Sequence, residues 1–455
     1  MPIKPLEKNS TRKIGALFIL VVLNCLFSVY NKYPILYSDT STYLSSGFEL
    51  EAPFDRPITY GILLRIFSLN GVSLYFVPFF QNLIFLYVLY SLLRVFFNAE
   101  SLFSNAFKLV IVLALATGFN WCINELLPDF LTSIGALSLF CIYQTKITRR
   151  EKISHYIIFF VCAASHVSNV FIYLLIILGL VIFRRRLMPD LTRKIFYERF
   201  AVSVSVLLIS FVIMASAISK SKAVFFSGSL AQKGILQKIL KDNCKINSFK
   251  LCAYADSIPN SFEYFVWNSS SPLYKIGGWK SARKELSVIN SLSLSNIKYI
   301  KMQAAHTFQN FFLQLYSFNI GEGNGAFSNE TILMKRIKNH VKFDKFTCEN
   351  SLQNRNGLAA MEDILNRIYA LTTTFAVLLF FWLYFKHRNH FNTNVKTLIF
   401  FVFVLIAANA FTVAYTSEVS NRHGCKLVWL FTLINYIILA GGNWGIPASK
   451  NNAQR

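Results

Sequence analysis

Long apolar runs bounded by clusters of lysine and arginine constrain this chain more than any other feature of its sequence. A run of about 20 apolar residues can cross the hydrocarbon core of a bilayer as a helix, and several runs here reach or approach that length. Only 15% of the 455 residues are charged, against roughly a quarter in a typical soluble chain. The sequence therefore predicts an all-α polytopic membrane protein.

The net charge of +24 fits the same interpretation, because many of the cations lie at the ends of apolar runs, as at 146–152 and 184–186. Cytoplasmic loops of membrane proteins carry such cations, and anionic lipid head groups attract them. We therefore expect membrane lipids among the partners of this chain, and no nucleic acid.

The cation clusters predict about ten transmembrane helices, with both chain ends in the cytoplasm. The stretch 153–183 decides the count: clusters flank it on both sides, so it must leave the cytoplasm and return, turning near 165–169. A single tilted helix is the alternative, and it would invert everything that follows. The expected spans are 14–30, 72–97, 103–117, one descending to 146, both halves of 153–183, 200–218, 368–385, 398–415 and 427–441.

The two ends of the first outer loop carry further expectations. The run Ile14 to Tyr30 is expected to stay as a span, because the residues 31–34 after it offer no small-residue cleavage site for a signal peptidase. The apolar piece 58–69 is too short to cross the bilayer and is expected at its surface.

The spans divide the chain into three parts. We expect an N-terminal transmembrane module of about seven spans over 1–218, with a first outer loop at 31–57. A large extracytoplasmic, α-rich domain follows over 219–366, and a C-terminal module of about three spans over 367–455. The outer domain is either a structural lid or the part that selects an acceptor.

Two local features of the outer domain are predicted. Apolar residues recur at near-helical spacing over 295–318, which indicates an amphipathic helix on the domain or membrane surface. Cys244 and Cys252 are close in sequence and can form a disulfide if this domain faces an oxidising compartment.

Residues able to do chemistry gather in the loops expected outside the cytoplasm. Asp39, in the loop segment 37–43, can act as a general base, because burial at the membrane boundary raises a carboxylate's pKa. The alternative is a helix-capping aspartate. Arg56 has the planar donor fork that suits a lipid phosphate, or it is an interfacial arginine paired with Asp55.

Glu125 and Asp129 lie in a return loop at 118–129. They can simply begin the fourth span, with Asp129 stabilising the N-terminus of its helix. Alternatively, they join Asp39 in holding a divalent cation, and no other cofactor is indicated.

A last group combines His166, at the turn of 153–183, with Glu418, Arg422 and His423 before the final span. Ionisable residues at membrane depth are costly to keep there and are functional candidates for that reason, although a lone histidine is more often structural. The chain contains no P-loop, GxSxG, HExxH or zinc-ligand pattern.

The order of these parts resembles the GT-C class of polytopic glycosyltransferases, such as the protein O-mannosyltransferases and aminoarabinose transferases. The resemblance rests on the acidic first outer loop, Ser38-Asp39-Thr40-Ser41-Thr42-Tyr43-Leu44, and on the following Arg56-Pro57-Ile58-Thr59-Tyr60-Gly61-Ile62-Leu63-Leu64. Arg422 before a late span also matches, although His423 stands where the family often has tyrosine. The likeness is best over 14–185, and Cys244 to Trp279 looks like a segment of uncharacterised bacterial membrane proteins.

The resemblance implies a GT-C-like fold in the bacterial inner membrane, with a site facing the exterior. It implies inverting transfer of a sugar from a polyprenyl-phosphate-linked donor to a glycan, lipid or protein acceptor. Asp39 would deprotonate the acceptor, and Arg56 and Arg422 would hold the phosphate. The residues that would assist catalysis or substrate binding are His166, Glu125, Tyr43 and Asp129.

Other functions stay open. A polysaccharide polymerase or ligase would depend on Arg56, Arg422 or His306 more than on Asp39. A flippase or transporter of lipids or glycans would need charged residues inside several spans, and the expected spans are nearly free of charge. A scaffold or assembly subunit is the remaining alternative.

Overall fold

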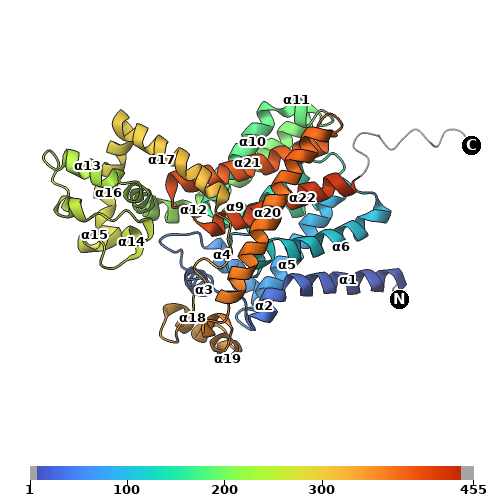
Figure 1. Ribbon diagram of the computed structural model, residues 1–455, viewed down its shortest axis with the longest axis horizontal. Helices are drawn as coiled ribbons and strands as arrows, with labels where there is room; N and C mark the ends of the chain where they lie inside the picture. The colour runs from blue at the N-terminus through green and yellow to red at the C-terminus, as the bar shows by residue number, and fades with distance from the viewer. Residues whose placement is uncertain (1–7, 442–455) are drawn as a thin grey trace, which may run out of the picture.

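The computed structural model describes residues 8–441, and over this range the chain is helical, with no β-strand (Figure 1). Outside the helices, an isolated backbone bridge joins Ile35 to Glu125. It links the first outer loop to the loop that precedes the fourth apolar helix, two segments that are far apart in sequence.

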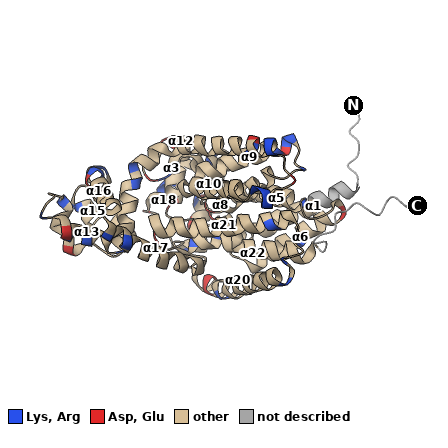
Figure 2. Cartoon of the chain, turned by 90° about the horizontal axis from the view of Figure 1, so that it is seen from above, with Lys and Arg blue, Asp and Glu red and all other residues tan. Residues whose placement is uncertain are grey.

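Within residues 8–441, six helices are long and apolar enough to cross a bilayer. They are α5 (Phe76–Leu93), α6 (Ala99–Ala116), α12 (Arg193–Gln232), α20 (Ala359–His387), α21 (Thr393–Thr416) and α22 (Asn421–Ala440). Charged residues are sparse along the middle of the chain's cartoon and denser toward its ends (Figure 2). The prediction of an all-α polytopic membrane protein is confirmed in this form, and the count of ten spans stays a prediction.

Shorter helices account for the other apolar runs. The predicted first span bends at Cys25, and the fourth apolar helix has only 12 residues, about 18 Å of rise, which is shorter than the hydrocarbon core. The loop expected at 118–129 contains a short helix. These elements are α1 (Lys8–Asn24), α2 (Leu26–Tyr30), α3 (Thr40–Glu49), α4 (Thr59–Phe67), α7 (Phe119–Asn124) and α8 (Leu131–Ile142).

The stretch 153–183 is broken as the sequence predicts. α9 (Arg149–Ser165) and α10 (Val167–Ile182) are separated at His166, whose backbone is extended. The rings of Phe159 and Tyr173 lie 5.2 Å apart, and these residues stand seven positions before and after His166. The chain therefore folds back on itself, and a single tilted helix is excluded.

α12 does not end at the membrane surface. It has 40 residues and is about 60 Å long, roughly twice the length needed to cross a bilayer. The boundary predicted at 218/219 falls inside this helix and the boundary at 366/367 falls inside α20, so each module passes into the next through a continuous helix, and the division into modules stays a prediction. A rise in polarity marks where a helix leaves an apolar region, but serine and lysine do not stop a helix.

The segment after α12 forms two parts rather than one domain. Residues 223–302 enclose their own hydrophobic core around the end of α12, and we call them the outer lobe. Its other helices are α13 (Ile235–Asn243), α14 (Phe262–Trp267), α15 (Pro272–Lys275), α16 (Gly278–Ser295) and the 3-10 helix η1 (Lys250–Ser257). In Figure 1, α13 to α16 stand apart from the rest of the molecule.

Residues 317–358 join the N-terminal half instead. α18 (Ile332–His340) packs on α3, and Leu333, Met334 and Ile337 belong to the main core. Gln353 anchors the first outer loop, because its side chain both donates to and accepts from the backbone of Leu36. The remaining short elements are α11 (Arg184–Leu187), α19 (Lys345–Glu349) and the 3-10 helix η2 (Gln353–Arg355).

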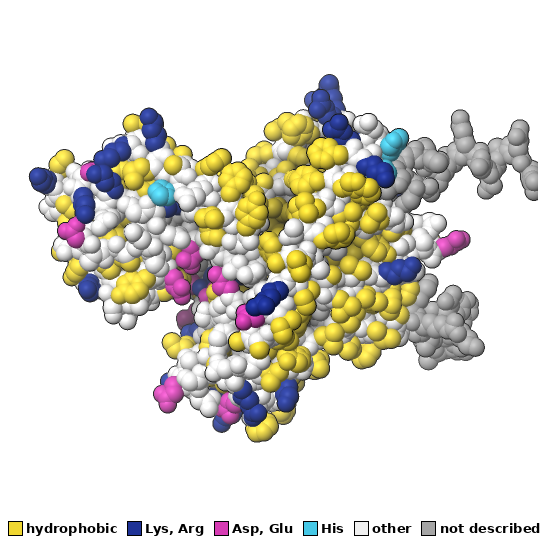
Figure 3. All heavy atoms as spheres, in the orientation of Figure 1, with side chains coloured by type: hydrophobic (Ala, Val, Ile, Leu, Met, Phe, Trp, Pro, Cys, Tyr) yellow, Lys and Arg dark blue, Asp and Glu magenta, His cyan; other side chains and the backbone are white. Residues whose placement is uncertain are grey.

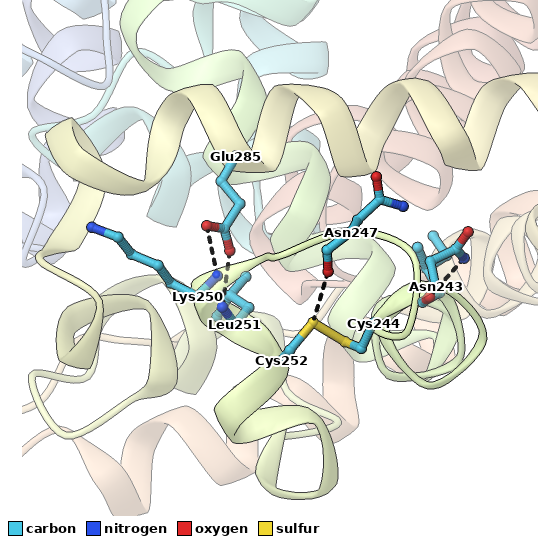
Figure 4. Close-up of a disulfide and its surroundings, with 8 residues drawn as sticks. Asn243, Cys244, Asn247, Lys250, Leu251, Cys252 and Glu285 are labelled. Carbon is cyan, nitrogen blue, oxygen red and sulfur yellow. Dashed lines mark hydrogen bonds between the residues drawn. A yellow bond between two sulfur atoms is a disulfide. The ribbon is translucent and has the colours of Figure 1, made fainter.

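The predicted disulfide between Cys244 and Cys252 is present in the outer lobe (Figure 4). Beside it, the carboxylate of Glu285 accepts backbone hydrogen bonds from Lys250 and Leu251, both at 2.9 Å. The disulfide and this carboxylate together fix the start of η1 on α16.

The helix predicted over 295–318 is confirmed as α17 (Ile297–Tyr316), which packs along α21. Polar residues of this helix face the protein interior and apolar residues face outward, which is the reverse of a surface helix in a soluble protein. Gln303 and Gln314 are buried and donate to backbone carbonyls of Ser293 and Ser420, whereas Phe308 is 68% exposed. An apolar face turned outward beside a membrane helix is typical of contact with lipid.

Candidate functional site

A cavity of about 1150 Å³ lies between the outer lobe and the membrane helices. Figure 3 shows the hollow between the two bodies, with acidic side chains at its edge. Its wall is built by the first outer loop, the turn before α10, α12, α14, α16 and the connection from α21 to α22. Segments from both halves of the sequence therefore meet at one site.

Close packing of α3 against α4 brings the two ends of the first outer loop together. A Cβ atom on Gly47 would come within 2.0 Å of the carbonyl oxygen of Gly61, so neither helix tolerates a larger residue there. The rings of Tyr43 and Tyr60 cross the same contact, 4.9 Å apart. This contact sets Asp39, before α3, beside Arg56, before α4.

Asp39 is held between two arginines. Its Oδ2 atom lies 2.8 Å from Arg56 Nη1 and 3.1 Å from Arg422 Nη1, so the three residues predicted to converge do so. Asp39 precedes α3, but its side chain makes no capping hydrogen bond. Asp39 therefore occupies the N-cap position that the alternative gives it, but its carboxylate contacts the two arginines and does not cap the helix.

Burial and the arginines act on Asp39 in opposite directions. Burial raises the pKa of this carboxyl, and the charges of Arg56 and Arg422 lower it by more, so the pKa lies below its ordinary value. Asp39 is therefore ionised at neutral pH. Over residues 8–441, both arginines contact Oδ2, and no hydrogen bond reaches the second oxygen, Oδ1.

Arg56 is paired with Asp55, as one interpretation of its role expects, and its binding of a lipid phosphate stays a prediction. Its Nε atom donates to Asp55 Oδ2 at 2.8 Å while Nη1 faces Asp39, and all three side chains line the cavity. The guanidinium also lies over the ring of Tyr43, with its carbon 5.4 Å from the ring centre. Tyr43 thus belongs to the same wall, as predicted.

Arg422 is positioned by the residues around the start of α22. The carboxylate of Glu322 accepts hydrogen bonds from Ser420 Oγ at 2.8 Å and from the backbone of Arg422 at 3.3 Å. The Arg422 guanidinium lies 4.8 Å above the ring of Tyr37. Its Nε is buried and has no hydrogen-bond partner within the described chain, so one donor of the fork is available to a ligand.

His166 lies in the cavity wall and also has a structural role. Its Nδ1 faces the backbone nitrogen and the hydroxyl of Ser168, at 3.4 and 2.7 Å, which caps the first turn of α10. The structural alternative for this histidine is therefore confirmed, and the break in the hairpin places the same ring beside the cavity.

Glu125 lies behind the cavity rather than in its wall. One oxygen, Oε1, accepts from Trp121 Nε1 at 3.0 Å and from Asn324 Nδ2 at 2.8 Å, and the residue is 5% exposed. Burial raises its pKa to about 7. Glu125 is not among the residues that line the cavity, and a part for it in catalysis stays a prediction.

Asp129 is the second carboxylate behind the cavity, and it binds a residue that sequence analysis missed. Lys426 Nζ lies 3.1 Å from Asp129 Oδ1, and His423 Nδ1 lies 3.7 Å from the same atom. Lys426 is fully buried. A signal was present, because Lys426 follows Arg422 by four positions and so lies on the same face of α22.

The proposed cation site is not formed. Asp39, Glu125 and Asp129 each bind different partners, and the part of the chain that the structure describes has no group of three or more His, Cys, Asp or Glu side chains able to hold a metal ion. The interpretation that these three carboxylates share a divalent cation is therefore wrong.

Part of the cavity wall is acidic and aromatic. Glu263 of the outer lobe and Glu418, before α22, line the cavity together with the half-exposed ring of Trp267. Burial raises the pKa of Glu418 to about 7, and the nearby Glu263 and Glu322 add to the increase. His306, the candidate for a polymerase or ligase, lies on α17 and is absent from the cavity wall.

Comparison with models of protein families, with curated proteins and with solved structures finds no match to this chain. Any conclusion about function must therefore come from the site itself.

Proposed function

We propose that this protein is a membrane glycosyltransferase of the GT-C type, which moves a sugar from a polyprenyl-phosphate-linked donor to an acceptor hydroxyl. The donor and acceptor would meet in the cavity, on the outer face of a bacterial inner membrane. The observation that carries the proposal is Asp39 held between Arg56 and Arg422 in the wall of a large cavity beside membrane helices.

The cavity offers both kinds of surface that such a donor needs. Its wall holds the two arginines, whose donor forks match phosphate oxygens. Apolar side chains of α10, α12 and α21 also line the cavity and suit the first isoprene units of the lipid chain. The apolar residues there are Val167, Phe171, Ile218, Phe226 and Val413.

In the proposed reaction Asp39 takes the proton from the acceptor hydroxyl, and the acceptor oxygen attacks the anomeric carbon of the donor sugar. A new carbon–oxygen bond forms as the bond from that carbon to the phosphate oxygen breaks. The electron pair leaves on the phosphate, and polyprenyl phosphate is released. Attack opposite the leaving group inverts the anomeric centre.

Donor binding would prepare Asp39 for this step. In the free protein both arginines contact Asp39, and their charges lower its pKa. A phosphate that shares the donors of Arg56 and Arg422 would weaken that effect, whereas burial, which raises the pKa, would remain. The carboxylate would then become a better base only when the donor is in place.

Replacement of Asp39 by asparagine tests the proposal. Asp39→Asn keeps the shape of the side chain and removes its basicity, so we expect transfer from polyprenyl-phosphate sugars to fall by about 10²–10⁴-fold. The measurement is release of polyprenyl phosphate from a panel of radiolabelled polyprenyl-phosphate hexoses and pentoses, in membranes that contain the protein.

Asp190→Asn is the matched control, because Asp190 is exposed and lies outside the cavity wall. It should release polyprenyl phosphate at the wild-type rate. An Asp39→Asn protein that is expressed normally and keeps most of its activity would remove Asp39 from the mechanism. A wild-type protein inactive on every donor of the panel would count against the whole proposal.

A further inference from the structure

A second pocket lies at the far end of α10 from the cavity. It has a volume of about 530 Å³ and is formed where α10 ends, α11 follows and α12 begins. We call it the arginine pocket, and its lining residues are Val181, Ile182, Phe183, Arg184, Arg185, Arg186, Arg193 and Tyr197. The 16 residues of α10 separate it from His166 by about 24 Å, so it lies on the opposite side of the membrane from Asp39.

The four arginines of this pocket have no carboxylate partner. None of them forms an ion pair within residues 8–441, although Asp190 and Glu198 are near in sequence. Arg184 donates to the carbonyl of Leu191 and lies over the ring of Phe196, and Arg193 lies over Tyr197. These contacts orient the guanidiniums of Arg184 and Arg193 but do not neutralise their charge.

Near the same end of the bundle Arg94 pairs with Glu151, whereas Arg149, Arg150 and Lys152 at the start of α9 form no ion pair within residues 8–441 and lie outside the arginine pocket. The arginine pocket therefore holds about four unneutralised positive charges in a small volume. Arg185, Arg186 and Arg193 are exposed, so solvent screens part of their mutual repulsion, and an anion that joins the cluster would remove more of it. In Figure 3, Lys and Arg side chains (dark blue) gather where Figure 1 labels α11.

Apolar surface continues from the pocket along the membrane helices. Ile182 is 74% exposed and Phe183 is 44% exposed, and on α12 Val202 is 45% exposed. These side chains belong to helices that are apolar enough for contact with the hydrocarbon core. A ligand that fits would therefore carry an anionic group at one end and hydrocarbon at the other.

We propose that the arginine pocket binds the head group of an anionic phospholipid from the leaflet opposite the Asp39 cavity. The lipid phosphate contacts the guanidiniums of Arg184, Arg185, Arg186 and Arg193, and the acyl chains lie on the exposed side chains of Ile182 and Val202. Basic pockets between transmembrane helices recognise anionic head groups by the same chemistry. The inference does not depend on the proposed enzymatic activity.

The test compares lipid binding by two triple variants of the purified, delipidated protein. Phosphatidylglycerol or phosphatidylcholine is added in detergent, and bound lipid is measured by native mass spectrometry. Each arginine near the membrane contributes about a fivefold effect on affinity. The variant Arg184→Gln/Arg185→Gln/Arg186→Gln should therefore bind phosphatidylglycerol between about 5-fold and 100-fold more weakly than wild type.

The matched control is Arg149→Gln/Arg150→Gln/Lys152→Gln, which removes three positive charges at the start of α9, outside the pocket. It should bind phosphatidylglycerol like wild type. A third variant, with lysine in place of Arg184, Arg185 and Arg186, should keep most of the binding and shows that the pocket folds. Equal losses in the glutamine variant and the control would overturn the proposal, because the effect would then come from general surface charge.

Two further outcomes would also overturn it. Equal affinity for phosphatidylcholine and phosphatidylglycerol would show that the pocket does not select charge. Full competition by millimolar inorganic phosphate would show a site for a free anion rather than for a lipid.

Discussion

The buried residues behind the cavity show how single side chains set its electrostatics. Lys426 is fully buried and Asp129 is 3% exposed, and their charges lie 3.1 Å apart. A pair of this kind adds little net stability when both members are present, but removal of one member leaves an uncompensated buried charge. Asp129 thus compensates the buried positive charge of Lys426, which lies one turn after Arg422 on α22.

Replacement of Asp129 alone should therefore be strongly destabilising. We expect Asp129→Asn to lower the free energy of unfolding by about 3–5 kcal/mol, and the double variant Asp129→Asn/Lys426→Met to recover part of this loss. Thermal unfolding in detergent measures both. If the double variant is no more stable than Asp129→Asn, the two charges are not coupled as the structure places them.

Glu125 predicts a dependence of stability on pH. Its pKa in the folded protein is raised to about 7 from an ordinary value of 4.5, so the folded state keeps this proton at a pH where the unfolded chain has lost it. The contribution of Glu125 to stability is therefore fully present below pH 4.5 and falls by about 3 kcal/mol as the pH rises to 7.

Glu125→Gln should remove that part of the pH dependence. Glutamine keeps the oxygen that accepts from Trp121 and Asn324 but cannot ionise. Melting temperatures of the variant and of wild type, measured from pH 4.5 to 8, should converge at the acid end and separate toward pH 8. Parallel curves would mean that Glu125 titrates normally.

Two thiols offer a check on how α7 packs against α22. The sulfur atoms of Cys122 and Cys425 lie 3.0 Å apart, and both residues are almost fully buried. Treatment with copper phenanthroline should join the two thiols by a disulfide. The thiols lose two protons, and the copper reagent accepts the two electrons. The sulfur atoms have to approach only to about 2.05 Å, so little backbone movement is needed. Mass spectrometry of alkylated peptides detects the product.

Cys141 and Cys162 serve as the control, because both are buried and neither is recorded in contact with another sulfur within residues 8–441. Cross-linking of these residues to Cys122 or Cys425 would contradict the packing described for α7 and α22.

At the scale of the elements, some features were predictable from sequence and others were not. The break in 153–183 was predictable, because cation clusters on both sides and a polar centre leave few alternatives. The meeting of Asp39, Arg56 and Arg422 was expected from the resemblance and from the topology that puts their loops on one side, but the α3–α4 packing that brings Asp39 beside Arg56 had no sequence signal.

The misses have physical reasons. The continuity of α12 across 218/219 was not predicted, because the boundary there was placed by polarity, and a helix ends where its backbone loses hydrogen bonds and not where its side chains become polar. The partners of Glu125 include Asn324, which is 199 positions away, and no local pattern reports such a contact. The orientation of α17 was also open, because an amphipathic pattern gives the apolar face but not what covers it.

At the scale of the whole molecule, α12 links the membrane helices to the outer lobe. The lobe contacts the end of α21 as well, where Ser229 Oγ and Lys233 Nζ both donate to the carbonyl of Tyr415 at 3.0 Å. The cavity lies between these two connections, so its width depends on α12 staying straight.

A proline in the middle of α12 should disturb the site without removing the protein from the membrane. Ser219 is exposed on this helix, and Ser219→Pro removes a backbone hydrogen bond and bends or breaks the helix, at a cost of about 3 kcal/mol. We expect transfer activity to be lost while membrane insertion is retained. The measurement is sugar transfer by the variant, next to its amount in the membrane fraction.

Ser219→Ala, which favours a helix, is the control and should behave as wild type. A fully active Ser219→Pro protein would show that the position of the lobe does not matter for the reaction.

The continuity of α12 also fixes a rotational relation between the two bodies that it joins. Each residue of an α-helix turns the chain by about 100°, so one inserted residue near Ser219 would swing the outer lobe around the helix axis and carry Glu263 and Trp267 away from Asp39. An insertion of seven residues, about two full turns, would nearly restore the angle while lifting the lobe by about 10 Å. The length of α12 between the membrane and the lobe therefore sets both the angle and the height of the lobe over Asp39, and the contacts of the lobe to Tyr415 fit only the present length.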